Sequence, residues 1–519
     1  SVAIATGTNL YDAITEAGVT GSRLDASAGD VTVEATSSAI IEAEPRAFAF
    51  ALSGGLVGFS AAGSGGLATN IMGTRTEAFV NGGSEIEAQN AVTIKALDVS
   101  DSVADVLAVS IAASASIGGA ASLAGSETIN TVTNVTRAKV DDAVIIATDD
   151  QILIDADGIQ DIQAAAMSVS SAAAAFSIAG AGAEATADIK ATVEASANDA
   201  TLQSATGVFV DADSDHTARG VSRAVSSGTV ALSVALAKAE VGGATRAFVT
   251  GDTTVKGGDF DVTADSKALA TQVDENGGIV PVISIGFAAG SGAEYISLVN
   301  RTTEAYIGTR TGLAPETSNV DFHTIADENI KGDIFVKAYS DFDADSLPKA
   351  LAFTVGAGAA VALADAKITG DTLAYVGEGT SLTARNLTIQ ADSDENADAK
   401  MSVVALGAGF AIGAADGLAE ISSNVEAFTG ARHFDDTDAG EAGLTSITLT
   451  GGGILDIDAT SERHADASAG GSEKDPFTDA ALSISFGISV TALTPDAKVL
   501  GDTRAYVGSG VTVSAADLD

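Results

Sequence analysis

The chain of 519 residues contains no cysteine, no tryptophan and only six prolines. The absence of cysteine excludes disulfide bonds, thiolate metal sites and cysteine nucleophiles. Aromatic residues make up only 5% of the chain, whereas glycine occurs 56 times. Small side chains must therefore fill most of the core, which suits the close stacking of many similar layers.

Basic residues are also scarce, with 26 Lys and Arg against 70 Asp and Glu and a net charge of −44. Nucleic-acid binding needs basic patches, so this charge excludes nucleic acid as a partner. The same surface attracts divalent cations. Hydrophobic residues nevertheless make up 46% of the chain, so it is folded and is not a disordered acidic tail.

A short phrase, Thr-x-Ala-(Phe/Tyr)-(Val/Ile), recurs along the chain. Clear copies are centred on Ala78, Ala247, Ala305, Ala374 and Ala505, and weaker copies on Ala138, Ala191 and Ala427. The mean spacing of these anchors is about 61 residues, and a fixed period of this kind indicates a stacked array. We therefore predict that residues 1–519 form one continuous array of units of about 60 residues.

A second phrase, (Val/Ile/Leu/Phe)-x-(Val/Ile)-x-Ala, follows each anchor, and one further copy precedes the first anchor. Its copies begin at Val31, Val92, Ile152, Val208, Phe260, Ile334, Leu387 and Leu455. In most copies a serine stands two residues after the alanine, at Ser37, Ser214, Ser266, Ser340, Ser393 and Ser461. Both ends of the chain lie within a repeat, so we expect a window truncated at both ends from a longer array.

Long uncharged segments such as residues 106–126 are long enough to cross a membrane as a helix. Their larger apolar residues alternate with small ones, as at Leu107, Val109 and Ile111, which is the strand period. We therefore expect strands and no membrane insertion, with Gly54, Gly118 and Gly356 at corners of a coil.

These patterns predict an all-β, elongated repeat array, and a β-solenoid (β-helix) is the favoured form. Solenoid turns commonly take about 20–30 residues, so each unit is expected to hold two or three turns. Tandem antiparallel β-sandwich modules are the alternative, because the long alternating runs also suit such strands.

If the copies stack in register, the anchors predict opposite charges side by side, such as Glu77 with Arg137 and Arg246 with Glu304. The anchor aromatics, among them Phe248, Tyr306 and Tyr375, are expected to fill the core of each unit rather than form a ligand-binding strip. Copies about 60 residues apart are expected to approach one another only through intervening turns.

Acidic residues cluster at the ends of the predicted strands, and clustered carboxylates are the ligands that Ca²⁺ prefers. The candidate metal ligands are Asp155, Asp157, Asp161, Asp211, Asp213, Asp215, Asp392 and Asp394. None of these segments matches an EF-hand loop or the nonapeptide of calcium-binding β-rolls. Solvated turns after strands are the alternative interpretation.

The acidic residues follow the repeat, whereas a catalytic pair is specific to one place. The four histidines share no metal-ligand spacing and are expected in solvated polar loops, at His216, His323, His433 and His464. We therefore expect no catalytic residues and no enzyme. A carbohydrate-active β-helix enzyme is an alternative that one unique acidic groove would favour.

Loop insertions are predicted near residues 311–329, 433–444 and 461–478, where the spacing between phrases grows or the sequence turns polar. Insertions in solenoids map to loops on one face, often the face that binds a partner. A surface glycan or a host or matrix ligand is expected there.

The combination of Thr-x-Ala-Tyr-Val-Gly (residues 503–508), Val-Thr-Val-Ser-Ala (residues 511–515) and long Gly/Ala/Val alternation resembles a known class of repeat. It is similar to the repeat regions of large bacterial surface proteins of the filamentous-haemagglutinin and leukotoxin-A-like filamentous adhesin type. That resemblance implies a secreted, extracellular or cell-surface structural segment that self-associates into filaments. A calcium-dependent surface-layer or matrix protein is the alternative.

Overall fold

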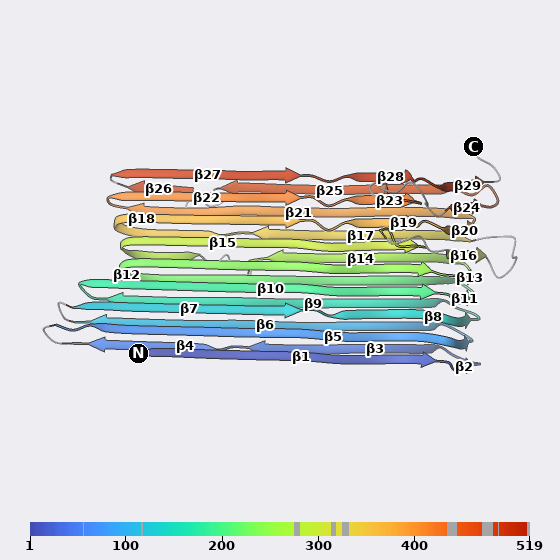
Figure 1. Cartoon of the computed structure of the whole chain (residues 1–519), viewed down its shortest axis with the longest axis horizontal. Coiled ribbons are helices and arrows are strands. Elements are labelled where there is room, and N and C mark those ends of the chain that lie inside the picture. The colour runs from blue at the N-terminus through green and yellow to red at the C-terminus, as the bar shows by residue number, and fades with distance from the viewer. Residues whose placement is uncertain are drawn as a thin grey trace.

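The computed structural model describes residues 1–54, 57–115, 118–273, 281–312, 318–323, 332–432, 444–469, 481–485 and 487–515. Over these residues it contains 29 strands and no helix, and hence no helix that could span a bilayer. The described strands pair in parallel, each with its counterpart one coil further along the chain. The chain is therefore all-β and winds as an elongated parallel β-solenoid (Figure 1). Antiparallel sandwich modules are excluded by this parallel pairing.

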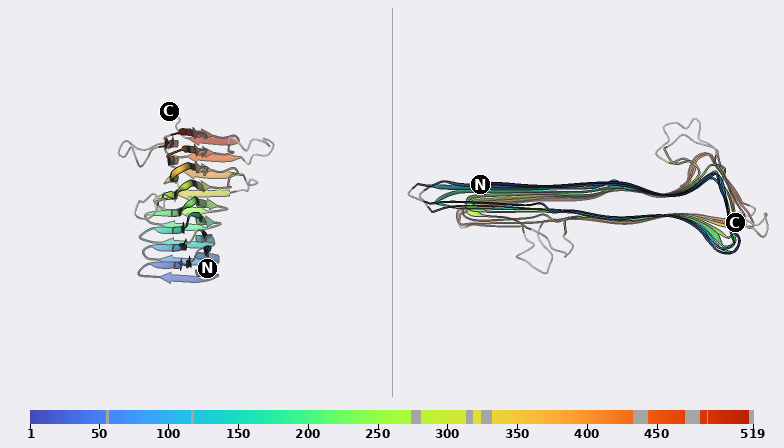
Figure 2. Two further views of the ribbon diagram at one scale, coloured as in Figure 1. Left: turned by 90° about the vertical axis from the view of Figure 1, so that its left-hand side faces the viewer. Right: turned by 90° about the horizontal axis from the view of Figure 1, so that it is seen from below.

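Each coil crosses a forward layer, a short tip layer and a return layer (Figure 2). The forward layer is formed by β1 (Val2–Thr20), β5 (Ser60–Ala88), β7 (Gly119–Val132), β8 (Val135–Ala147), β10 (Phe176–Asn198), β12 (Gly207–Thr250), β15 (Val282–Ile307), β18 (Lys349–Ile368), β19 (Thr372–Val376), β22 (Phe410–Ile421), β23 (Val425–Thr429), β27 (Ile488–Val499) and β28 (Thr503–Val507). The tip layer contains β2 (Arg23–Ala26), β11 (Thr201–Ser204), β13 (Thr254–Lys256), β16 (Ser318–His323), β20 (Thr380–Ala384), β24 (Thr445–Leu449) and β29 (Val511–Ala515), together with the ends of β5 and β8. The return layer contains β3 (Val31–Ala43), β4 (Arg46–Ser53), β6 (Val92–Ser114), β9 (Ile152–Ala173), β14 (Asp259–Thr271), β17 (Asp333–Ser346), β21 (Asn386–Gly407), β25 (Leu455–Ala469) and β26 (Ala481–Ser485), together with the first parts of β12, β15 and β18.

Each unit of the sequence makes one coil, so the expectation of two or three turns per unit is wrong. The register shows this directly, since Val2 pairs with Gly63 and Val92 pairs with Ile152. The reason is that the uncharged alternating segments form long strands joined by one short turn, which in most coils contains glycine. At that turn Gly118 is required, because a Cβ there would lie 1.5 Å from the carbonyl oxygen of Gly58.

The anchor alanines lie in one column across the coils. The column contains Ala17, Ala78, Ala138, Ala195, Ala247, Ala305, Ala374, Ala427 and Ala505. The predicted anchor at Ala191 is therefore wrong by four residues. Its true counterpart, Ala195, was hidden because the surrounding residues include neither the threonine nor the aromatic residue of the phrase. Ala17 was missed because Gly18 stands in the place of the aromatic residue, although Thr15 is present.

Viewed along the stack, the coil is a thin blade that widens at one end into a triangular lobe (Figure 2). Inside the blade the two layers meet through small side chains such as Ala112, Ala120 and Ala172. Inside the lobe the core contains larger residues, including Ile94, Ile145 and Phe260. Side-chain size thus sets the thickness of the coil, and the long axis of the molecule runs along its strands (Figure 1).

The serine and threonine of the two phrases meet inside the coil, at the junction of blade and lobe. Ser214 Oγ lies 2.7 Å from Thr245 Oγ1, and Ser340 Oγ lies 2.6 Å from Thr372 Oγ1. Each pair joins the return layer to the forward layer of the same coil. We call this column of hydroxyl pairs the Ser–Thr seam; it gives both recurrent residues a structural role.

The three predicted insertions fall largely outside the described residues. Within them, Ser318–His323 forms β16 and residues 461–469 belong to β25, so these parts are strands and not loops. Residues 433–443 and 470–478 lie outside the described part of the chain. The binding role predicted for these segments remains a prediction.

Candidate functional site

Four of the eight predicted metal ligands lie together on the outer side of the return layer. Asp155 and Asp157 alternate along β9, and the register places them beside Asp211 and Asp213 of β12. Carboxylate oxygens of Asp155, Asp157 and Asp213 lie within 4.8 Å of one another. We call Asp155, Asp157, Asp211 and Asp213 the aspartate cluster.

A lysine from the preceding coil already neutralises part of this cluster. Lys95 Nζ donates hydrogen bonds to both Asp155 and Asp157. An ammonium group therefore stands beside two of the three carboxylates that a cation would use. Calcium needs about six to eight oxygen ligands, so it would compete with Lys95 for these carboxylates. Calcium binding here remains a prediction.

The carboxyl groups of Asp211 and Asp213 are weaker acids than usual. Desolvation by the surrounding protein, followed by repulsion from Asp213, raises the pKa of Asp211 to about 7. Desolvation and then repulsion from Asp157 raise the pKa of Asp213 to about 7. Each pKa exceeds the ordinary aspartate value because the protein offers these two carboxylates too little positive charge.

The other four predicted ligands do not join the cluster. Asp161 forms an ion pair with Arg219, and Asp215 lies in register with Lys267. Asp392 accepts a hydrogen bond of 2.7 Å from Gln390 Nε2. Asp392 and Asp394 belong to β21, three coils from β12.

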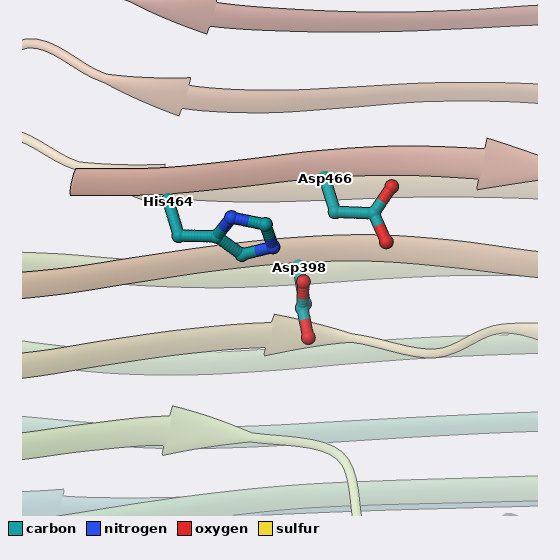
Figure 3. A group of neighbouring side chains, drawn as sticks. All are labelled: Asp398, His464 and Asp466. Carbon is teal, nitrogen blue, oxygen red and sulfur yellow. The ribbon is translucent and has the colours of Figure 1, made fainter.

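A second group of possible ligands was missed by the sequence analysis. Asp398 of β21 lies beside His464 and Asp466 of β25, with one ligand atom of each within 4.8 Å of the others (Figure 3). The sequence signal that could have indicated this group is the pair His464-x-Asp466, because residues two apart on a strand share a face. Its mixed nitrogen and oxygen donors suit a transition metal better than calcium. Lys400 forms an ion pair with Asp398, and its Nζ lies 3.8 Å from a carboxylate oxygen of Asp466. As in the aspartate cluster, a lysine ammonium group already lies beside the carboxylates.

The anchor aromatics stack directly on one another along the forward layer. Ring centroids are 4.9 Å apart for Phe248–Tyr306, 5.1 Å for Tyr306–Tyr375, 4.8 Å for Tyr375–Phe428 and 5.3 Å for Phe428–Tyr506. We call these five residues the aromatic stack. The expectation of copies separated by intervening turns is wrong, because one unit is one coil.

The aromatic stack lies on the outer side of its strands, so the expectation that it fills the core of each unit is also wrong. Its middle members Tyr306, Tyr375 and Phe428 are nevertheless buried. Glu304 accepts 2.8 Å hydrogen bonds from Arg246 and Arg310, and Thr311 donates its backbone N–H to the Tyr375 hydroxyl at 3.1 Å. These contacts confirm the predicted Arg246–Glu304 pair. Glu77 does lie in register with Arg137, but its ion-pair partners are Arg75 and Lys139.

Charged side chains occupy the interior near the Ser–Thr seam. Arg301 is fully buried and donates to the hydroxyls of Ser214, Thr245 and Ser266, and burial lowers its pKa to about 9. Glu395 is also fully buried and accepts a 3.0 Å hydrogen bond from Arg463. Together these groups place buried charge beside the hydroxyl pairs of the seam.

Three of the four histidines lie on strands and not in the expected loops. His216 is a fully buried residue of β12, and burial lowers the pKa of its imidazole. His464 lies on β25 beside Asp466. His323 ends β16, whereas His433 lies outside the described residues.

Replacement of Asp211 by asparagine should stabilise the protein above neutral pH and flatten its pH dependence. Between about pH 4 and pH 7 the folded carboxyl group binds a proton that the unfolded one releases, so stability falls as pH rises. After allowance for solvent screening we expect a gain of about 1–2 kcal/mol at pH 8 and little change at pH 4. Thermal unfolding followed by circular dichroism from pH 4 to pH 8 measures the effect.

Asp215→Asn is the matched control, because it removes one negative charge from the same strand outside the aspartate cluster. An equal gain from both substitutions would assign the effect to the overall charge of −44 and contradict a local origin.

Comparisons with protein-family models, with curated proteins and with solved structures gave no match.

Proposed function

We propose that this chain is a structural segment of an extracellular bacterial filament or giant adhesin. The observation that supports this most is the unbroken register: each coil pairs in parallel with the next from β1 to β29. Such an array gives mechanical continuity, and repeat proteins of this kind serve as extended scaffolds. The likeness of its phrases to filamentous adhesin repeats agrees with this role.

The two ends of the described array offer a way to extend it. β1 pairs with β5 alone, and β27 pairs with β22 alone, within the described residues. The outer side of each strand therefore presents unpaired N–H and C=O groups. Such edges are templates for pairing with another strand. In the proposed role, further coils or further copies add at these edges.

The shape of the array makes the filament a ribbon rather than a cylindrical rod. A forward run of 19 residues in β1 alone spans roughly 60 Å, and the tip strand adds to this. Successive coils are only about 4.8 Å apart along the stack. Extension at the edges would therefore lengthen a band that is several times wider than it is thick.

Electron microscopy of the purified chain tests this proposal, with calcium in one sample and chelator in the other. We expect flat ribbons that lengthen with protein concentration in both samples. Thr6→Pro should shorten the ribbons, because proline removes a donor from the edge strand β1, whereas Thr6→Ala should not. Separate particles of one chain at every concentration would contradict extension at the edges.

The aspartate cluster favours a second candidate, a calcium-dependent surface-layer or matrix protein. Its three converging carboxylates are the specific observation that supports it. Ribbons that form only with calcium would favour this candidate over the first. A carbohydrate-active enzyme would need an acid pair unique to one coil, and the aspartate cluster instead belongs to a column that continues through Asp157, Asp213 and Asp265.

A further inference from the structure

The blade end of every coil is free of charge on its forward face. Three outward columns of residues make up this surface, which we call the apolar face. The first column contains Ala61, Ala121, Ile178, Val230, Ala288, Ala357, Phe410 and Ile488. The second contains Val2, Gly63, Leu123, Gly180, Leu232, Gly290, Ala359, Ile412 and Val490. The third contains Ile4, Gly65, Gly125, Gly182, Val234, Gly292, Val361, Ala414 and Ala492.

The large side chains of this face point to solvent, whereas the small ones of the same strands point inward. Ile178 is 58% exposed and Leu232 is 57% exposed, while the neighbouring Ala179 and Ala231 are buried between the layers. An ordinary sheet would bury its large aliphatic residues and expose the small or polar ones. An extended apolar surface of this kind marks an interaction site.

The apolar face has ridges and furrows, because glycine and leucine alternate from coil to coil in the second column between Gly63 and Gly290. The Cδ2 atom of Leu123 lies 2.9 Å from the place of a Cβ on Gly180, and Leu232 leans over Gly290 in the same way. A furrow of about 300 Å³ lies beside Leu232, between Gly290 and Phe410. Leucines two coils apart thus form ridges about 10 Å apart, with space between them for side chains from another surface.

We propose that the apolar face binds the same face of a second copy of this chain, related to it by a two-fold axis. Nine coils of about 4.8 Å and three columns spanning about 15–20 Å give roughly 600–800 Å² per copy. The total of roughly 1,200–1,600 Å² lies in the range of stable protein interfaces. A face whose ridges and furrows alternate can fit its own two-fold mate, as an isologous contact requires.

The distribution of charge supports this occupant and this orientation. Acidic residues begin in the next outward column, at Glu127, Glu184, Glu294 and Asp416. Two copies with a net charge of −44 each would repel if their acidic parts overlapped. In an arrangement that overlaps only the blade ends, the acidic lobes point in opposite directions and stay apart.

The acidic column beside the apolar face argues against a lipid bilayer as the occupant. Glu127, Glu184 and Glu294 stand directly beside the third apolar column. A bilayer that covered the apolar face would bring these carboxylates to hydrocarbon, where a charge is costly. At an interface between two copies the same carboxylates stay in water beside the contact. The contact uses the faces of the blades, so it is independent of extension at the edges.

Sedimentation velocity of the full chain tests the proposal through a substitution in the centre of the apolar face. We expect the wild type to form pairs of blades, and Leu232→Lys to weaken their association by at least about 100-fold, because the two-fold axis places two lysines in an apolar contact. The matched control is Ile71→Lys, which changes a 42% exposed aliphatic residue of the same layer outside the apolar face. It should leave association unchanged, and circular dichroism should show both variants folded.

Two results would overturn the proposal. One is a wild-type chain whose side-by-side association is absent up to about 100 µM or is lost equally in both variants. The other is binding of the unpaired wild type to neutral phosphatidylcholine vesicles, which would assign the apolar face to lipid. Thr6→Pro keeps the tests separate, because it should shorten ribbons at the edges while blade pairs persist.

Discussion

Tyr375→Ala should cost about 3–5 kcal/mol of stability, which is the usual loss when a large buried aromatic side chain is deleted. Tyr375 is fully buried and stacks on Tyr306 and Phe428 in the two adjoining coils. Its removal would interrupt the aromatic stack at its centre and leave a cavity under Thr311. Urea unfolding followed by circular dichroism measures the loss.

Tyr375→Phe separates the stack from the hydroxyl group. Phenylalanine keeps both ring contacts and loses only the hydrogen bond from the Thr311 backbone, so we expect a loss of about 1 kcal/mol. If the alanine and phenylalanine variants were equally destabilised, the stacking would contribute nothing and the hydroxyl would explain the whole effect. Because an array unfolds in parts, hydrogen exchange of the neighbouring strands should show the alanine effect concentrated in β15, β19 and β23.

Glu395→Ala is the second substitution with a large expected effect, about 3–5 kcal/mol. The carboxylate of Glu395 is fully buried and accepts hydrogen bonds from Ser393, Ser423 and Arg463. Its removal leaves the Arg463 guanidinium mostly buried without its ion-pair partner, the costly way to break a buried pair. Thermal unfolding at pH 7 gives the loss.

Glu395→Gln is its matched variant, because glutamine keeps the shape and one acceptor oxygen. We expect a smaller loss of stability than for alanine. The difference between the two variants measures the contribution of the cavity and of the acceptor oxygen that only alanine removes. Equal stability of wild type, alanine and glutamine variants would show that Arg463 finds water instead, and would contradict a buried ion pair at this position.

The alternation of residue size was readable from the sequence, but the turn within it was not. The period of two over residues 106–126 predicts that Leu107 and Leu123 face the same side, and both do point outward. They nevertheless lie in different layers, β6 and β7, because the chain reverses between them without changing the alternation. A strand pattern reports which side a residue faces, and it contains no information on where a glycine-rich run bends.

The proximity of the candidate site's residues could be predicted from the sequence only within a single strand. Asp155 and Asp157 share a face by period two, so their proximity follows from the sequence. The approach of Lys95 and Asp213 depends on offsets of 60 and 56 residues between coils, and these offsets vary along the chain. The proximity of Asp398 to His464 could not be predicted for the same reason, since the register between their strands is offset by 68 residues.

The long reach of every pairing has a consequence for how the chain acquires its structure. Paired strands of successive coils join residues separated by as few as 52 and as many as 78 positions, as in Ile178 with Val230 and Phe410 with Ile488. Pairings this distant fold slowly, so a completed coil is the natural surface on which the following one forms. The closure entropy of the longer coil exceeds that of the shorter one by only about 0.4 kcal/mol. Growth coil by coil therefore tolerates insertions of very different length, and new loops can be added to the lobe with little cost to folding.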